Sequence, residues 1–571
     1  MKVINPKVRL RDLSPQQRRV IRGWCMYDWA NSAFSTSGTA AIFPVYFVVI
    51  FKAAMGDNTD FFGFSMTGSS IWSLGVALST AIVAVSSPVL GVIADRAAIK
   101  KTLLWIYTIA GSAFTVLAFF SVYTSQPWIW LALSFGLANI GFSGSLVFYN
   151  SILPHIAPKH LLDDVSSRGF AYGYIGAGLL LAIHLAAIFV FSGTELEDFI
   201  TRLCIATVGF WWFGFAIWTL KTVPEPPIFN PVPGLNISSA LRLAIKELGK
   251  TLRGITKFKT LLIYLVAYLL FNDGIQTVLA IAGAYGADTL GITLIFNMMT
   301  ILIIQFIAAP GAMLFSRLAS WVRTKPALIV GMIGWCVVVL FGVGIAPLVP
   351  SSQNEFDYQF KFDQPTNSYL VIAAPNLSGS EPDTMWEQNH GDLQEAGSIS
   401  VNQTRILFTE IRESATARFS VSIVEGPLAG QTSVGAKHVS SMGEGPLDWW
   451  PLTLRTVFWE PLGLSSSFQW LILGALLGVV MGGSQALSRS LFAQIMPETR
   501  SGEFFSFFGF MSRASTVIGP TLYILFTGLF DTRVAISSLL VIIVVGTVML
   551  RWVDVDAGSR LADLEDQRNR A

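Results

Sequence analysis

Two short polar segments share one pattern inside long apolar stretches. Each has an aspartate, an amide three residues later and a hydroxyl four residues later: Asp28, Asn31 and Ser32 in the first, and Asp273, Gln276 and Thr277 in the second. On an α-helix these offsets place all three polar side chains on one face. An ionisable group inside a bilayer costs about 2.5–3.5 kcal/mol on insertion scales, and such groups usually mark a pathway. We therefore predict a duplicated membrane protein with a water-filled pathway between its halves.

Two arginines in apolar stretches could pair with these carboxylates. Arg489 lies about 12 Å from the end of its predicted helix at Pro497, and Arg513 lies in the following stretch. Buried cations and carboxylates in one bundle usually pair, so two interpretations of Asp28 and Arg489 stay open. They either contact the transported species or form a fixed ion pair at a gate. Asp273 lies about 21 Å into its helix, and we expect a pathway role there because transporters bind near the midplane.

Other polar residues of the apolar stretches are candidate lining residues. The amides are Asn139, Asn150, Gln276, Gln305 and Gln485. Each could line the pathway or simply form a hydrogen bond between helices. His184 could relay protons because imidazole titrates near neutrality, although a single histidine in an apolar helix is more often a satisfied polar residue.

The sequence has no motif for an enzyme or a metal site. It contains no GxxxxGK[ST] loop, no HExxH and no GxSxG, and its three cysteines all lie in apolar stretches. We therefore predict no catalytic residues, no metal and no cofactor. The net charge of +2 gives no reason to expect a nucleic-acid partner.

The composition indicates that lipid is the solvent of most of the chain. Hydrophobic residues make up 53% of the sequence and charged residues only 13%, against about 25% in soluble chains. Apolar stretches long enough to cross a bilayer recur in two sets of six. They are 24–51, 68–94, 102–124, 127–153, 169–192 and 203–220, then 260–286, 290–315, 326–349, 467–496, 504–530 and 534–552. The predicted fold class is an all-α membrane protein with twelve transmembrane helices in two pseudo-symmetric six-helix bundles.

The distribution of basic residues predicts the topology. Arg18, Arg19 and Arg22 precede the first apolar stretch without a small-residue cleavage site, so no cleavable signal peptide is expected. Basic residues also crowd the turn after the second stretch and the C-terminal tail, while the alternate loops have few. By the positive-inside rule both termini are cytoplasmic.

Five segments follow from these assignments: an N-terminal bundle over 1–220, a cytoplasmic linker over 221–259, helices 7–9 over 260–350, an insert over 351–465, and helices 10–12 with a cytoplasmic tail over 466–571. Residues 238–258 of the linker predict a basic amphipathic helix, lying either on the leaflet or on the protein's own loops. Period-two alternation at 358–363 and 418–423 predicts antiparallel strands, so the insert is a small β-rich domain outside the cytoplasm. We expect it to be a structural addition.

The turn after the second apolar stretch carries a recognisable motif. Its residues are Gly91, Asp95, Arg96, Lys100 and Lys101. Here Gly91 permits close helix contact, Asp95 can cap a neighbouring helix, and the cations hold the turn at the headgroups. The motif resembles the gating signature between helices 2 and 3 of the major facilitator superfamily. That family pattern usually has glycine where Ala98 stands, and the counterpart at 312–323 keeps Arg317 but has Ser316 in the acidic position.

A narrower resemblance covers most of the membrane part. It rests on the segments 24–34, 148–154, 167–176, 271–277 and 485–490. These are similar to the autophagy-related vacuolar amino-acid effluxers and their bacterial relatives, which implies a multi-pass protein of the bacterial plasma membrane and amino-acid efflux as the leading activity. The insert is not part of this pattern.

The function we predict is secondary active transport of a small polar or zwitterionic solute by alternating access, with a co-transported proton as a candidate partner. Arg489 or Arg513 would bind a carboxylate, and Asp28 or Asp273 an ammonium group. The expected partners are the solute and the lipid bilayer, and the protein is expected to be a monomer. The alternative is a non-transporting receptor or scaffold that uses the β-rich insert as its sensor.

Overall fold

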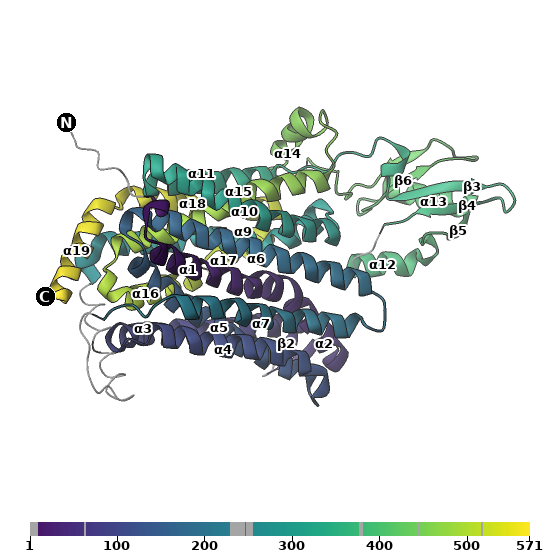
Figure 1. The fold of residues 1–571 in the computed structure, drawn as a ribbon. Helices are drawn as coiled ribbons and strands as arrows, with labels where there is room; N and C mark the ends of the chain where they lie inside the picture. The colour runs from purple at the N-terminus through teal and green to yellow at the C-terminus, as the bar shows by residue number, and fades with distance from the viewer. Residues whose placement is uncertain are drawn as a thin grey trace.

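The computed structural model describes residues 9–56, 58–61, 64–228, 246, 255–375, 381–443, 445–515 and 518–571. Long helices pack side by side into one elongated bundle, with a small domain beyond one end (Figure 1). Helix α1 (Pro15–Ala33) begins, and helix α19 (Val555–Arg570) ends, at the opposite end of the bundle. We call that end cytoplasmic, following the charge pattern. The amphipathic helix predicted over 238–258 lies outside the described residues, apart from 246 and 255–258.

Eleven helical spans in the described part of the chain are long and apolar enough to cross a membrane. After the first span, the N-terminal half contains α3 (Gly68–Ala97), α4 (Lys100–Leu117), α5 (Pro127–Ile156), α6 (Leu162–Phe191) and α7 (Glu197–Thr222). The C-terminal half contains α9 (Lys259–Leu290), α10 (Leu294–Val322), α11 (Thr324–Val343), α15 (Ser466–Ile495) and α18 (Thr532–Met549). The all-α membrane architecture is confirmed, with eleven candidate spans where twelve were predicted.

The first span is longer than its apolar stretch predicts. It begins at Pro15 because Ser14 and Gln17 form a capping box, in which each side chain accepts a hydrogen bond from the other residue's backbone N–H. It then runs through a π-helical segment, η2 (Phe34–Ile42), into α2 (Phe43–Met55). π-Helical turns are rare and often occur at functional sites. A short hairpin, β1 (Asn58–Phe61) and β2 (Phe64–Thr67), follows.

The prediction of one continuous helix over 504–530 is wrong. The structure has two helices there, α16 (Ser501–Ala514) and α17 (Ile518–Leu529). Pro520 lacks a backbone N–H and its ring would clash in the middle of a helix, but it is tolerated in the first turn of α17. The N-terminus of α17 is also capped by the side chain of Asp273 in α9.

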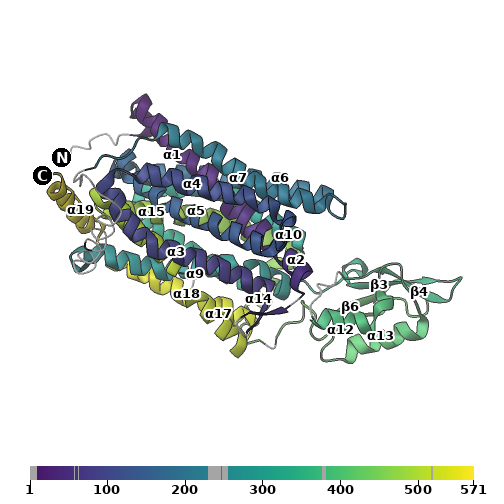
Figure 2. The same cartoon turned by 90° about the horizontal axis from the view of Figure 1, so that it is seen from below.

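The insert is an α/β domain and not purely β. Its sheet has the order β5-β4-β3-β6-β7, formed by β3 (Tyr358–Asp363), β4 (Ser368–Ala373), β5 (Ser398–Ser400), β6 (Ser420–Ile423) and β7 (Thr432–Val434). Both alternating segments form strands with an antiparallel neighbour, β3 with β4 and β6 with β7, but β3 and β6 pair parallel with each other. Parallel neighbours need a crossover, and helices α12 (Glu381–Asn389) and α13 (Val401–Glu413) lie between them in the chain. Figure 2 shows this domain standing clear of the bundle.

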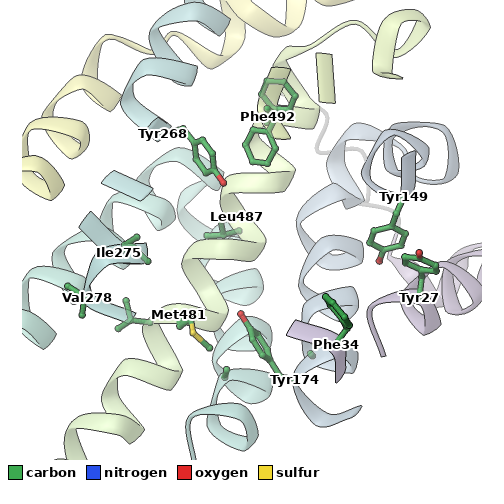
Figure 3. Close-up of a cluster of buried hydrophobic side chains, with 14 of the residues drawn as sticks. Tyr27, Phe34, Tyr149, Tyr174, Tyr268, Ile275, Val278, Met481, Leu487 and Phe492 are labelled. Carbon is green, nitrogen blue, oxygen red and sulfur yellow. The ribbon is translucent and has the colours of Figure 1, made fainter. Parts of the chain in front are cut away.

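Several helix contacts join the halves of the bundle. Helix α6 of the N-terminal half packs along α10 and α15, and α3 and α5 pack against α16. Aromatic residues from both halves fill the core beside these contacts, including Tyr149 and Tyr174 from one half and Tyr268 and Phe492 from the other (Figure 3). These contacts position the candidate site.

Candidate functional site

A cavity of about 380 Å³ lies between the two halves, in the part of the bundle nearer the insert. The N-terminal half contributes three lining residues, all from the π-helical segment: Ser35, Thr36 and Ala40. The rest of the described lining comes from α9, α10, α11, α15 and α18. A cavity that touches both halves is the place where a transporter of this architecture binds its solute.

A polar layer closes the bundle on the cytoplasmic side of the cavity. Asp28 of α1 and Arg489 of α15 form an ion pair across the halves, with both guanidinium Nη atoms 3.2 Å from Asp28 Oδ2. Tyr149 donates to the same oxygen at 2.8 Å. Arg489 also donates to the side chains of Asn150 and Ser166 and to the Ser166 carbonyl. The layer therefore brings together three residues singled out from the sequence: Asp28, Asn150 and Arg489.

Aromatic rings and a glycine enclose this ion pair. The Arg489 guanidinium lies 4.1 Å from the ring centre of Phe170 and 4.8 Å from that of Trp24. A Cβ atom at Gly169 would lie 2.5 Å from Asp28 Oδ2, so the α6 backbone approaches the carboxylate too closely for a larger residue. Asp28 and Arg489 are 5% and 3% exposed. Breaking such a buried pair by removing one partner typically costs about 3–5 kcal/mol.

Further hydrogen bonds cross the same interface. Tyr174 of α6 donates to Gln485 Oε1 of α15 at 2.7 Å. The carboxylate of Asp163, at the start of α6, accepts from Thr324, Ser490 and Gln494 of the C-terminal half. These contacts also join the two halves on the cytoplasmic side of the cavity.

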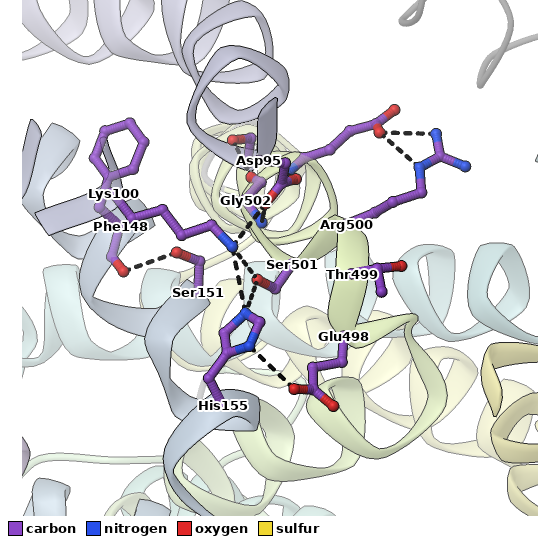
Figure 4. A network of polar contacts seen from close by, with 12 residues as sticks. Asp95, Lys100, Phe148, Ser151, His155, Glu498, Thr499, Arg500, Ser501 and Gly502 are labelled. Carbon is purple, nitrogen blue, oxygen red and sulfur yellow. Dashed lines mark hydrogen bonds and ion pairs between the residues drawn. The ribbon is translucent and has the colours of Figure 1, made fainter. Parts of the chain in front are cut away.

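The gating motif forms a second inter-half contact, shown in Figure 4. Asp95 accepts hydrogen bonds from the backbone N–H groups of Gly502 and Glu503, both at 2.9 Å, and so caps the start of α16. A carboxylate at a helix N-terminus is favoured by the helix dipole and by the free N–H groups there. Gly91 permits this contact, because a Cβ atom at that position would lie 2.4 Å from the Gly502 carbonyl oxygen.

The cations of the motif occupy different environments. Lys100 is buried, with its Nζ 2.7 Å from Asp95 and 2.8 Å from Ser501, whereas the sequence predicts it at the headgroups. Arg96 and Lys101 are partly exposed. The backbone N–H groups of Lys100 and Lys101 both donate to Glu225 of the linker, which ties the linker to the start of α4.

His155 and Glu498 extend this contact at the cytoplasmic end. The His155 ring bridges Ser501 and Glu498 (Figure 4). Glu498 also pairs with Arg570 of α19. Burial alone would raise the pKa of Glu498, but the contacts with His155 and Arg570 outweigh burial and lower it. Glu498 is therefore held ionised as an anchor between α5 and α19.

Ala98 stands in the motif where the superfamily usually has glycine, and the structure explains why glycine is suited there. Ala98 ends α3 with φ of +49°, in the left-handed region, and Arg323 has φ of +73° in the equivalent turn of the second half. We expect Ala98→Gly to raise unfolding stability by about 0.5–1 kcal/mol, because the left-handed penalty for alanine exceeds the entropic cost of glycine. Thermal unfolding in detergent measures this. The matched change Ala97→Gly, within the helix, should lower stability, and an equal drop for both would contradict the expectation.

Asp273 occupies a different place from the cavity-facing one that its helical face predicts. It is fully buried, and its two carboxylate oxygens accept from the backbone N–H groups of Ile518 and Gly519 at 2.8 and 2.9 Å. Its neighbour Asn272 donates to Ser515, beside the break between α16 and α17. This face of α9 therefore contacts the start of α17, and neither residue is among those lining the cavity described above.

Three further sequence candidates, Arg513, Gln276 and His184, are held by protein contacts. Arg513 donates to the carbonyl oxygens of Gly509 and Ser143, and Gln276 donates weakly to Asn272 at 3.4 Å. His184 lies between the hydroxyls of Ser37 and Thr207, at 2.6 and 2.8 Å. This is the satisfied arrangement that a single buried histidine usually has. Asn31 is buried, and its Nδ2 has no hydrogen-bond partner among the described residues.

The sequence interpretation missed several residues of the site. The cavity residues Ser35, Thr36 and Thr300 are short hydroxyls in apolar helices and give no periodic pattern. Nothing in the sequence distinguishes Trp470 from the many other aromatic residues of the chain. Asp163, by contrast, had a readable signal, because a carboxylate in the first turn of an apolar helix needs a partner.

The paired halves, the central cavity and the capped gating motif define a transporter of the major facilitator fold. The structure is similar to that of the proton:xylose symporter XylE bound to 6-bromo-6-deoxy-D-glucose, with a TM-score of 0.55 at 12% identity over 94% of this chain and 95% of that one. It is also similar to a variant of the E. coli fucose:proton symporter FucP, with a TM-score of 0.53 at 9% identity over 94% and 98%. At these identities the likeness shows the fold alone.

Sequence comparison gives the family. The profile described as "Vacuole effluxer Atg22 like" matches residues 16–363 and 449–563, so this chain belongs to that family. It is 26% identical over 554 residues to the uncharacterized MFS-type transporter YxiO of Bacillus subtilis, covering 96% of each chain. It is 22% identical over 664 residues to autophagy-related protein 22-1 of Penicillium rubens, covering 98% of this chain and 93% of that protein.

These comparisons confirm the resemblance that the motifs predict. The protein is a multi-pass integral membrane transporter of the major facilitator type and not an enzyme. The residues that the profile leaves unmatched between its two segments, 364–448, fall within the insert.

Proposed function

We propose that this protein is a secondary active transporter that moves a small polar solute by alternating access. The observation that carries the proposal is the asymmetry of the contact between the halves. A cavity shared by both halves lies on the insert side, while Asp28 and Arg489 close the cytoplasmic side. Alternating access requires such an asymmetric state and a second state in which the closed layer opens.

Three narrower features belong to the same proposal. Amino-acid efflux is the candidate activity that the family resemblance supports. The location is the bacterial plasma membrane with both termini in the cytoplasm, which the basic loops support. A proton is the candidate coupling ion, because the buried carboxylate of Asp28 lies at a contact between the halves that alternating access must rearrange.

A receptor that uses the insert as its sensor is the rival function. The cavity between the halves and the three inter-half contacts of Asp28, Asp95 and Asp163 favour transport, because a fixed scaffold needs neither. Deleting 351–465 tests whether the insert has a sensor role. A sensor accessory loses ligand response and keeps solute flux, whereas a structural addition keeps both.

The test combines solute flux with accessibility on both sides. A variant without Cys25, Cys204 and Cys336 receives one reporter cysteine, Ala40→Cys in the cavity or Ser490→Cys at the closed layer. Proteoliposomes are then screened for counterflow against a metabolite panel. We expect a transported solute to change maleimide labelling at positions 40 and 490 in opposite directions. Labelling at position 490 that stays absent under every solute and pH gradient, with no counterflow, would contradict transport.

A further inference from the structure

The guanidinium group of Arg489 is bound by the N-terminal half of the bundle, although Arg489 belongs to α15 of the other half. It donates to Asp28 of α1, to the Asn150 side chain of α5, and to the hydroxyl and the carbonyl of Ser166 in α6. Among the described residues, none of its hydrogen-bond acceptors belongs to the C-terminal half. Arg489 therefore occupies a site on the N-terminal half as a ligand would.

Aromatic rings from the same three helices surround this cation. The guanidinium carbon lies 4.1 Å from the ring centre of Phe170, 4.8 Å from that of Trp24 and 5.7 Å from that of Tyr149. A cation within about 6 Å of a ring centre is attracted by the ring face. The cation cage is the set of residues that bind this guanidinium: Trp24, Asp28, Tyr149, Asn150, Ser166 and Phe170.

Contacts within the N-terminal half hold the cage together. The Tyr149 hydroxyl donates to Asp28, and the Trp24 indole N–H donates to the Tyr149 carbonyl at 3.0 Å. The Trp24 and Tyr149 rings stack with centres 4.4 Å apart, and both side chains are fully buried. Gly169 leaves room for the cation, because a Cβ atom there would lie 3.0 Å from an Arg489 Nη atom. Separation of the two halves breaks none of these contacts within the cage.

The polar atoms of the cage match a primary ammonium group. Three acceptors, Asp28 Oδ2, Asn150 Oδ1 and the Ser166 carbonyl oxygen, lie 2.8–3.2 Å from the two guanidinium Nη atoms. A primary ammonium group has three N–H donors and the same charge as a guanidinium group. A quaternary ammonium group would contact the rings but leave the three acceptors without a donor.

We propose that the cation cage binds the ammonium group of the transported solute when the cytoplasmic side is open, and that Arg489 occupies the same site when that side is closed. This inference rests on the proposed transport function and deepens it, because it gives the ammonium group of an amino acid a binding site. The exchange keeps a cation beside Asp28 in both states, which avoids the cost of an unpaired charge. A solute bound in the cage excludes Arg489 and therefore favours the open state.

The first test is thermal unfolding of Arg489→Ala in detergent with methylammonium, tetramethylammonium or sodium chloride. We expect methylammonium to stabilise this variant at a concentration at least tenfold lower than tetramethylammonium, and sodium to have no such effect. The parent protein should need at least tenfold more methylammonium, because Arg489 fills its cage. Equal effects of the three salts on the variant, or equal methylammonium requirements of variant and parent, would overturn the proposal.

Substitutions in the Arg489→Ala background assign the binding to the cage. Asp28→Asn and Phe170→Leu should each raise the methylammonium concentration needed at least tenfold, whereas Phe170→Tyr should keep it. A purely structural role for Phe170 would lower stability without changing that concentration. Phe189→Leu is the matched control, because Phe189 lies on the same helix and is 75% exposed. An unchanged methylammonium requirement in Asp28→Asn would overturn the proposal.

A second measurement keeps Arg489 and does not depend on the folding of Arg489→Ala. Maleimide labelling of Ser490→Cys, in the variant without native cysteines in lipid nanodiscs, is followed with leucine, 3-methylbutylamine and 4-methylpentanoate. The amine lacks the carboxylate of leucine, and the acid lacks its ammonium group. We expect leucine and the amine to accelerate labelling at least tenfold and the acid to have no effect. Acceleration by the acid, or by none of the three, would overturn the proposal.

Failure of this inference is distinguishable from failure of the transport proposal. Counterflow of a solute without an ammonium group, with opposite labelling changes at positions 40 and 490, would keep the transporter and overturn the cage as its solute site. Positions 40 and 490 that never change in opposite directions, with no counterflow of any solute, would overturn transport itself, whatever cation the cage of Arg489→Ala binds.

Discussion

Replacing either partner of the Asp28–Arg489 pair should open the cytoplasmic side of the protein. Both residues are buried and both contact the opposite half, so Asp28→Asn or Arg489→Gln removes an interaction that joins the halves on that side. The loss of one partner from such a pair is about 3–5 kcal/mol, and each 1.4 kcal/mol is a factor of ten in a population. We expect the population of the closed state to fall, and flux against a gradient to decrease at least tenfold.

The measurement is maleimide labelling of Ser490→Cys, whose parent side chain contacts Asp163 across the halves. Each single variant should label at least tenfold faster than the parent. The double variant should label more slowly than either single one, because no uncompensated charge stays buried in it. The control pair is Asp198 and Arg202, an ion pair within α7 that joins no halves. Labelling that is unchanged in both single variants would show that this pair does not hold the gate.

An ion pair between Asp28 and Arg489 was one of two interpretations of the sequence. The cost of an unpaired charge in a bilayer explains why this pair was predictable. A charge in an apolar helix must find a partner inside the bundle, so Asp28 and Arg489 had few alternatives. Helix ranges followed from apolar length for the same reason, since a bilayer imposes a minimum span. The capping role of Asp95 was predicted from its position at a helix end near Gly91. In the structure its carboxylate accepts hydrogen bonds from the backbone N–H groups of Gly502 and Glu503.

Other features of the site leave no local trace in the sequence. The segment η2 differs from the adjoining α-helices only in its backbone hydrogen bonds, which follow the π-helical pattern. Its residues, Phe34–Ile42, are of types that are common in apolar α-helices. The cavity depends on which faces of six elements converge, and neither Gln305 nor Trp470 reveals from its neighbours that its polar atom stays unpaired. The break before α17 had a signal in Pro520, but prolines also lie within α3, α5 and α10 without ending them.

Asp273→Asn should loosen α17 because the aspartate caps that helix. Its carboxylate accepts from two consecutive backbone N–H groups, those of Ile518 and Gly519, at the first turn. Asparagine keeps one acceptor oxygen and turns an NH₂ group toward the other N–H. The lost cap, the lost charge–dipole attraction and one unsatisfied buried N–H together amount to about 2–4 kcal/mol. We expect amide hydrogen exchange in 518–529 to accelerate at least tenfold, and Asp273→Ala to accelerate it further.

A proton-carrier role for Asp273 makes a different prediction. A carrier variant would lose pH-driven accumulation, keep counterflow and leave exchange in α17 unchanged. A capping variant would accelerate exchange in α17 and slow both kinds of flux together, because α17 supports the helix face that contains Asp273. The matched control is Asp531→Asn, since Asp531 caps α18 in the same way by accepting from the Val534 N–H. That variant should accelerate exchange at the start of α18 alone, so an effect on α17 in both variants would mean that the change is global and that capping by Asp273 does not explain it.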